Sequence, residues 1–196
     1  IQGNYVRLGD HGWAKISDAL RKQLGKLHDS VNEDRKNLVF DASSAKVVQD
    51  LADHQIQVTG TSAWTQCLER MERSKHISPE LPKNLNAQLR DYQREGYCWM
   101  SRLAEWGVGG VLADDMGLGK TLQTLAVLLD RSKLGPALVI APTSVGFNWV
   151  REAEKFTPDL KAHLYRETDR DDFLSNIGPG DLVVCSYGLV LRDSEK

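Results

Sequence analysis

One segment of the sequence combines glycines, a lysine and a threonine at the spacing of a phosphate-binding loop. It reads Asp-Asp-Met-Gly-Leu-Gly-Lys-Thr over residues 114–121. Gly117 and Gly119 allow the tight turns that direct backbone N–H groups at phosphate oxygens. Lys120 can place an ammonium on the β- and γ-phosphates of a nucleotide, and the Thr121 hydroxyl can bind Mg²⁺. The segment therefore predicts a site for nucleotide phosphates.

Such a loop has to connect a strand to a helix. The apolar residues 109–113 precede it and predict a short buried strand, and a helix is expected to begin near Lys120 and to run through Leu129. The N-terminus of that helix adds its dipole to the phosphate site. The strict pattern G-x-x-x-x-G-K-[ST] starts with glycine, whereas this segment starts with Asp114. A glycine-rich turn without a ligand is the alternative interpretation.

Three further segments predict the sheet that would position this loop. Residues 137–141, 161–165 and 181–185 are strand candidates, and helix candidates lie around residues 149–153 and 169–176. Continuous apolar strands separated by helices are typical of a parallel sheet that is covered on both faces. We therefore expect an α/β fold. Glycine and proline at residues 135–136 end the helix that follows the loop.

Polar residues follow two of these strands, and a long helix precedes the loop. Pro142, Thr143 and Ser144 come after the first strand, and Ser186 and Tyr187 come after the last. Ligands in open α/β sheets gather at the carboxyl ends of the strands, although a helix cap would also explain these residues. Residues 89–106 are expected to form a helix, for which a purely amphipathic role is the alternative.

These segments together resemble the motifs of SWI/SNF-type ATPases, the superfamily-two branch that translocates along duplex DNA. The loop resembles the first helicase motif of that family. Leu-Arg-Asp-Tyr-Gln at residues 89–93 resembles its adenine-recognition helix, residues 141–152 resemble its motif Ia, and residues 186–188 resemble the block called Ib. The four blocks occur in the family's order over about residues 85–190. The resemblance implies a partial RecA-like P-loop lobe.

The resemblance also implies cofactors and site residues. ATP and Mg²⁺ would be the cofactors, with Lys120 and Thr121 as catalytic residues and Thr121 as the metal ligand. Gln93 would read the adenine edge, because an amide can both donate to it and accept from it. The implied nucleotide-binding residues are Arg90, Tyr92, Gln93, Asp115, Met116, Gly117, Leu118, Gly119, Lys120, Thr121 and Leu122. The implied nucleic-acid contacts are Pro142, Thr143, Ser144, Asn148, Trp149, Ser186 and Tyr187, whose hydroxyls and backbone N–H groups would hold a DNA phosphate.

The first part of the chain predicts a small α+β accessory module over residues 1–76. Its pattern indicates a hairpin at residues 5–16, helices over residues 17–31, 47–51 and 61–73, and short strands at 38–40 and 56–58. Two prolines in residues 77–86 mark a linker, which leaves residues 87–196 as the lobe. The module resembles, more loosely, the accessory region upstream of the ATPase in bacterial members of the family.

The composition is that of an ordinary globular chain. The 196 residues carry a net charge of −2, and hydrophobic residues make up 41%, which excludes intrinsic disorder. Residues 1–84 have net charge +1 and residues 85–196 have −3, so neither part is basic. No apolar run reaches the ~18 residues of a membrane span. Three cysteines without a CxxC pair favour a reducing compartment, and we expect a cytoplasmic, nucleoid-associated bacterial location.

The sequence has no acidic D-E-x-H or D-E-A-Q block in residues 122–196, and it has no second lobe. We therefore expect the chain to be truncated after the Ib block and to be non-catalytic alone, while the full-length protein is an ATPase that moves along duplex DNA. Three alternatives stay open. These are a small-molecule kinase with a P-loop, an RNA-directed superfamily-two helicase, and a degenerate P-loop lobe that acts as an interaction scaffold. Protein partners are not indicated.

Overall fold

The computed structural model describes residues 5–7, 12–29, 31–34, 37–40, 44–52, 61–166 and 170–193. The chain divides into two compact units. The first comprises Ile1–Ile77 with Leu103–Gly109, and the second comprises Ser78–Arg102 with Gly110–Lys196. Each unit has its own apolar clusters. Among the helices in the described ranges, none is long and apolar enough to cross a membrane.

The strands of the first unit form two antiparallel hairpins. Strand β1 (Tyr5–Arg7) pairs with β2 (Trp13–Lys15), which confirms the predicted first hairpin. Strand β3 (Val31–Asp34) pairs with β4 (Asn37–Phe40). The prediction for Val31 was wrong, because it lies in β3 and not on the apolar stripe of the preceding helix. Its backbone groups are paired across the second hairpin instead of along a helix axis.

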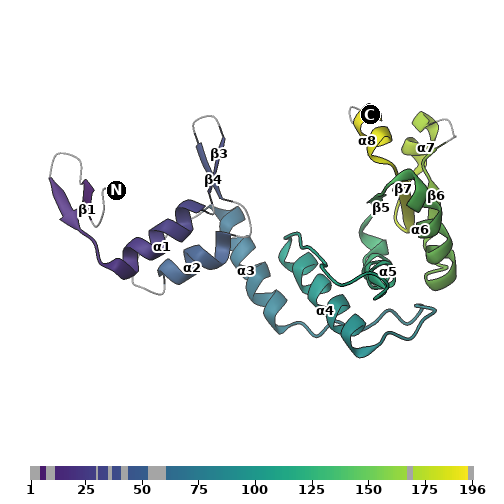
Figure 1. The fold of residues 1–196 in the computed structure, drawn as a ribbon, viewed down its shortest axis with the longest axis horizontal. Helices are drawn as coiled ribbons and strands as arrows, with labels where there is room; N and C mark the ends of the chain where they lie inside the picture. Colours follow the sequence, from purple (N-terminus) through teal and green to yellow (C-terminus); the bar gives the residue numbers. More distant parts are fainter. Residues whose placement is uncertain are drawn as a thin grey trace. The chain divides into compact units, whose positions relative to one another are not determined.

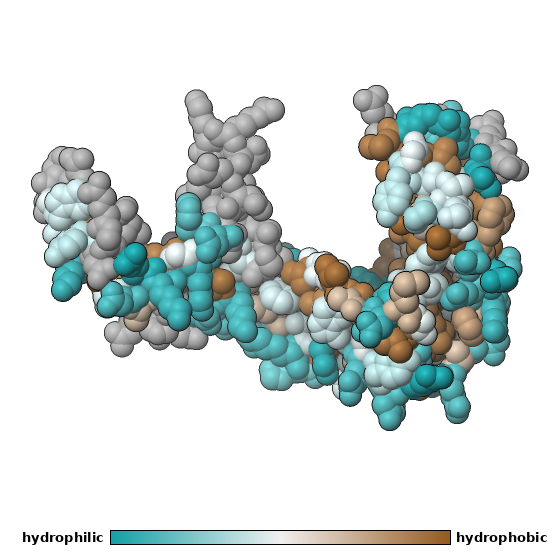
Figure 2. All heavy atoms as spheres, in the orientation of Figure 1, coloured by the Kyte–Doolittle hydropathy of each residue, from teal (hydrophilic) through white to brown (hydrophobic). Residues whose placement is uncertain are grey.

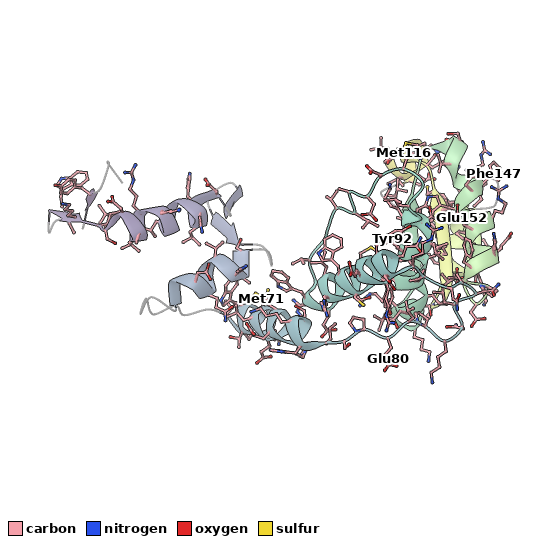
Figure 3. The ribbon with its side chains drawn as sticks, turned by 60° about the horizontal axis from the view of Figure 1, so that its bottom comes forward. Met71, Glu80, Tyr92, Met116, Phe147 and Glu152 are labelled. Carbon is pink, nitrogen blue, oxygen red and sulfur yellow. The ribbon has the colours of Figure 1, made fainter. Side chains whose placement is uncertain are left out.

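The described part of the first unit also contains three helices, besides the last turn of the long helix that follows them. Helices α1 (Asp18–Asp29), α2 (Ala45–Ala52) and α3 (Ser62–His76) correspond to the predicted ones. The Ser17 hydroxyl caps α1 by accepting from the Leu20 N–H at 3.2 Å. A small core forms around Met71, which Figure 3 labels on α3. The members of this core are Ala45, Trp64, Cys67, Leu68, Met71 and Trp106. The strand expected at residues 56–58 lies outside the described residues.

Helix α4 (Asp91–Trp106) is the long helix predicted before the loop. Its residues 91–102 belong to the second unit. Tyr97, which has no exposed surface, packs with Ala126 and Val127 of helix α5 (Lys120–Asp130). The Tyr97 hydroxyl also donates to the carbonyl oxygen of Glu80 at 2.7 Å. Helix α4 is therefore fixed both to α5 and to the segment that precedes it.

The second unit contains a three-stranded parallel sheet, which confirms the α/β fold expected from the apolar segments. Strands β5 (Ala137–Ile140), β7 (Asp181–Cys185) and β6 (Lys161–Leu164) lie in that order (Figure 1). Leu138 and His163 both lie opposite Val183. A short 3₁₀ helix, η3 (Ser132–Leu134), leads from α5 into β5.

Helices pack on both faces of this sheet. Helices α5 and α6 (Thr143–Phe156) cover one face, where their apolar side chains meet Leu182 and Val184. Helices α7 (Arg170–Asn176) and α8 (Tyr187–Asp193) contribute to the cluster around Val183 and Cys185 on the other. On β5, Leu138 and Ile140 remain 58% and 41% exposed. Hydrophobic side chains accordingly reach the surface of this unit in Figure 2.

The strand predicted at residues 109–113 does not form, so that prediction was wrong. Residues 107–119 make an irregular loop, in which the Val111 side chain is 83% exposed. A strand needs a neighbour for its N–H and C=O groups, and the described sheet provides none for this segment. Gly107, Gly109 and Gly110 further lower its preference for extended pairing.

Candidate nucleotide site and nucleic-acid interface

The predicted phosphate-binding loop leads directly into helix α5. Gly117 and Gly119 have φ angles of 84° and 80°, in the left-handed region that residues with a Cβ rarely adopt. Gly119 is the N-cap of α5, and no side chain of a described residue caps the helix there. The first-turn N–H groups of α5 therefore face the loop as donors suited to an anion.

The side chain of Lys120 closes this loop. Its Nζ donates to the carbonyl oxygens of Asp114, at 2.7 Å, and of Asp115, at 2.9 Å. A half-buried ammonium thus lies beside the glycine turn and is held by two peptide carbonyls. No carboxylate of a described residue forms an ion pair with it. Its positive charge is therefore suited to phosphate oxygens.

Gln93 connects helix α4 to the loop. This side chain is only 7% exposed. Its Oε1 accepts from the Arg90 N–H at 3.0 Å, and its Nε2 donates to the Leu118 carbonyl at 3.1 Å. The first bond is one half of a capping box, in which a glutamine in the first helical turn reaches back to the N-cap. A Cβ at Gly119 would lie 2.5 Å from the Gln93 Nε2, so a side chain at this position would have to displace the amide.

A second glutamine, Gln123, also hydrogen-bonds to the loop, and the sequence analysis did not single it out. Gln123 has no exposed surface, and its Nε2 donates to the Asp114 carboxylate at 3.2 Å. Its Oε1 is buried without a hydrogen-bond partner among the described residues. A Cβ built on Gly96 of α4 would collide with that oxygen. The signal that points to this packing is a glycine in the middle of a helix, which costs about 0.5–1 kcal/mol relative to alanine.

The other predicted nucleotide residues lie around this arrangement. Met116 is 96% exposed in the loop, and Tyr92 is 36% exposed on α4; both are labelled in Figure 3. Thr121 and Leu122 are half-buried in the first turn of α5. Thus the structure brings Gln93 into direct contact with the loop. Within the described ranges, no hydrogen bond joins the Tyr92 side chain to it.

The donor set suits Mg²⁺ bound together with phosphates. In the part of the chain that is described, no group of three or more His, Cys, Asp or Glu residues could hold a metal ion alone. Mg²⁺ in nucleotide sites takes one or two protein oxygens and completes its shell with phosphates and water. The Thr121 hydroxyl, with Asp114 and Asp115 in the same loop, fits that requirement.

A second candidate site lies at the carboxyl edge of the sheet. The parallel register brings the segments after β5, β6 and β7 to this edge. A small hollow opens there, and it includes Pro142, Thr143 and Ser186 of the predicted nucleic-acid contacts. The complete lining consists of Ala141, Pro142, Thr143, Gly146, Leu164, Tyr165, Arg166, Val184, Cys185, Ser186 and Leu189.

The remaining predicted nucleic-acid residues do not line this hollow. Ser144 and Tyr187 are exposed beside it, and the Asn148 carboxamide accepts from Arg151 at 3.2 Å on the outer face of α6. The partly buried Trp149 instead packs against the apolar cluster that contains Leu182 and Val184. The structure thus separates the predicted contacts into a group around the hollow and a group along α6.

Ionisable groups behave differently at the two edges of the sheet. At the amino edge, the Gly178 N–H and the His163 side chain, at 2.8 and 2.9 Å, lower the pKa of the Asp181 carboxyl. At the carboxyl edge, burial raises the pKa of the Cys185 thiol. The thiol is therefore neutral. The polar side-chain groups of the hollow are then its hydroxyls and the Arg166 guanidinium.

Comparison with known families assigns residues 92–196 to the SNF2-related domain. This match covers more than half of the chain, so the chain belongs to that family, as its motifs indicated. YwqA of Bacillus subtilis (strain 168) is 34% identical over 94% of this chain, which is 22% of YwqA. The chromatin-remodeling ATPase INO80 of Cryptococcus neoformans is 42% identical over 58% of this chain, which is 7% of INO80.

A solved structure supports the same assignment. The SWI2/SNF2 ATPase core of Sulfolobus solfataricus, determined in complex with dsDNA, matches with a TM-score of 0.55 and 42% identity. The match covers 61% of this chain and 25% of that core. The chain thus spans a quarter or less of the length of these relatives. The chain belongs to the SWI/SNF-type, superfamily-two helicase-like ATPases, and its parallel sheet matches part of a RecA-like lobe of such a core.

Proposed function

We propose that the protein containing this chain uses ATP to move along duplex DNA. In this proposal the chain provides the nucleotide-binding half of the motor site and one side of the DNA path. Lys120 binds the β- and γ-phosphates, Thr121 binds Mg²⁺, and Gln93 reads the adenine. Mg²⁺, when bound, would neutralise part of the negative charge of the nucleotide phosphates.

The observation that carries the proposal is the joint placement of Gln93 and Lys120. The two side chains come from different helices, and both hydrogen-bond to carbonyls of the same loop, at Leu118 for Gln93 and at Asp114 and Asp115 for Lys120. One loop is therefore in contact both with an amide able to select a base and with an ammonium able to hold phosphates.

Duplex DNA is the proposed track because of the second site. Thr143 and Ser186 bring hydroxyls to one hollow at the carboxyl edge of the sheet, and the first turn of α6 adds N–H groups. Such groups bind the phosphate backbone and carry no sequence information. The dsDNA complex of the Sulfolobus relative supports the choice of ligand. Pro142, Ser144, Asn148, Trp149 and Tyr187 complete the proposed DNA contacts.

We also propose the division of labour along the chain. Residues 1–76 would form an accessory module, residues 77–86 a linker and residues 87–196 an incomplete first motor lobe. The match to YwqA extends over 94% of this chain, whereas the match to INO80 covers 58%, which favours an accessory module of bacterial type. A cytoplasmic location at the nucleoid belongs to the same proposal.

The test is ATP hydrolysis by the full-length protein that contains this chain. Turnover is measured without nucleic acid and with duplex DNA, single-stranded DNA or RNA, for the parent protein and for Lys120→Ala. We expect stimulation by duplex DNA and loss of turnover in Lys120→Ala. Stimulation by RNA alone would favour an RNA-directed helicase, and unchanged turnover in Lys120→Ala would reject the phosphate assignment.

The 196-residue chain alone is expected not to turn over ATP at an enzymatic rate. Arginine fingers contribute about 10³–10⁵ in rate in related phosphoryl-transfer sites. In the proposed motor they come from a second lobe, whereas the described residues of this chain form one parallel sheet. Absence of nucleotide binding by the chain would instead favour a scaffold role.

A further inference from the structure

Arg166 lies at the carboxyl edge of the sheet, beside residues that the DNA proposal uses. It follows β6 by two residues, its side chain is exposed, and it lines the same hollow as Thr143 and Ser186. The parallel register of β6 with β7 brings it to the edge where β7 ends in Cys185. No motif singled out this arginine, because it stands outside the blocks that resemble the family.

An aromatic ring on α6 positions the guanidinium. The Arg166 Cζ lies 5.3 Å from the centroid of the Phe147 ring, which is itself 59% exposed. Phe147 is labelled on α6 in Figure 3. A guanidinium stacked on an aromatic face keeps its N–H groups in the plane free for a second partner. An exposed phenylalanine gains little from burial at such a place, so a stacking role explains its presence better than core packing.

The charges around the hollow favour an anion. Arg166 is the charged side chain among its lining residues, and the others offer hydroxyls, backbone groups or apolar surface. The Asp193 carboxylate, which accepts from the Tyr165 hydroxyl at 3.4 Å, is balanced by its ion pair with Arg170 at 2.8 Å. Among the described residues, no carboxylate forms an ion pair with Arg166. The first turn of α6, a helix of 14 residues, adds N–H groups at Thr143 and Ser144 that have no acceptor within the helix.

We propose that Arg166, stacked on Phe147, binds a backbone phosphate of duplex DNA together with Thr143 and Ser186. This inference rests on the proposed function and adds a residue and a contact geometry to it. Because the contact is to phosphate, it strengthens binding to every sequence alike and makes binding more sensitive to salt.

The test measures binding of a fluorescein-labelled duplex to the 196-residue chain by anisotropy over a series of salt concentrations. The slope of log K against log salt is negative, and removing one phosphate contact reduces its steepness by about 0.9. We expect this decrease, with weaker binding, for Arg166→Ala. Arg166→Lys keeps a positive charge and is expected to keep the slope. Lys161→Ala is the matched control, since it removes one exposed charge from the opposite end of β6.

Each outcome has a defined consequence. A less steep salt dependence of log K in Arg166→Ala, with parent-like steepness in Arg166→Lys and Lys161→Ala, supports the inference. An unchanged slope in Arg166→Ala overturns it, and so does an equal decrease in Lys161→Ala, which would be an effect of net charge. If the parent chain binds no duplex at any salt concentration, the DNA part of the proposed function fails, and this result is distinct from a failure of Arg166 alone. Circular dichroism of each variant establishes that it is folded.

Discussion

The Gln123 carboxamide donates to the Asp114 carboxylate at 3.2 Å from a side chain with no exposed surface. Asp114 stands where the strict phosphate-loop pattern has glycine, so the loop begins with a side chain that is anchored from helix α5. Lys120 holds the carbonyl of the same residue. Two side chains of α5 therefore fix the start of the loop that precedes this helix.

Gln123→Glu should destabilise the second unit. The substitution replaces the buried donor with a carboxylate oxygen beside Asp114, so the hydrogen bond becomes a repulsion. We expect a loss of about 1–3 kcal/mol in the free energy of unfolding, the usual cost of an unpaired buried polar group. Urea unfolding followed by circular dichroism measures it. The exposed Gln88→Glu is the control, and equal losses in the two variants would contradict the anchoring role.

Gly96→Ala should also destabilise the second unit, although a glycine-to-alanine change inside a helix is usually stabilising. Alanine normally gains about 0.5–1 kcal/mol over glycine there. At Gly96 the new Cβ would collide with the Gln123 carboxamide, and overpacking of this kind costs about 1–3 kcal/mol. We therefore expect faster amide hydrogen exchange in α4 of Gly96→Ala than in the parent chain. Gly25→Ala in α1 should instead slow exchange, because no described residue beyond the adjoining backbone of α1 comes within 4 Å of the new Cβ.

Gln93→Ala should weaken ATP binding and reduce the preference for ATP over GTP. The amide contributes one hydrogen bond to the Leu118 carbonyl, and its proposed contact with adenine would be lost as well. A net contribution of about 1 kcal/mol corresponds to roughly a fivefold change in affinity. Competition between the two nucleotides in a calorimetric titration measures it. The exposed Gln66→Ala serves as control, and an unchanged ATP-to-GTP ratio in Gln93→Ala would argue against base selection by this amide.

Acid should destabilise the second unit partly through Asp181. The Gly178 N–H and His163 hold the pKa of this carboxyl below its ordinary value of 3.8. Its contribution to stability is therefore complete above that value and is lost as the pH falls through the lower folded pKa. Unfolding by urea at a series of pH values between neutral and acid should show a shallower decline for Asp181→Asn than for the parent chain. Identical declines would mean that this carboxyl does not contribute.

The elements that carry the strongest local patterns could be predicted from the sequence. The helix that begins at Lys120 and the strands β5, β6 and β7 were predicted to within one residue. Apolar runs and glycine punctuation define the helix, β5 and β7. Strand β3 was missed because Asn32, Glu33 and Asp34 give it no apolar alternation, and its stability depends on pairing with β4. The strand expected at residues 109–113 failed for the opposite reason, since an apolar pattern without a neighbouring strand cannot form a ladder.

In the candidate site, too, the features encoded by a local pattern could be predicted and the contacts between distant residues could not. Glycines and a lysine at fixed spacing predict the loop because its chemistry lies within eight consecutive residues. The contacts of Gln93 with Leu118 and of Gln123 with Asp114 join residues of different elements or turns, and no local pattern encodes them. The placement of Arg166 over Phe147 likewise depends on how α6 packs beside β6.

The central claim is that Lys120 binds nucleotide phosphates, and calorimetric titration of the 196-residue chain with Mg²⁺-ATP tests it most directly. A charge-assisted contact contributes about 1.5–3 kcal/mol, so Lys120→Ala should weaken binding roughly tenfold or more. Lys133→Ala, which removes an exposed lysine in η3 just after the same helix, should bind like the parent chain. Equal affinities of the parent chain and Lys120→Ala would contradict the claim.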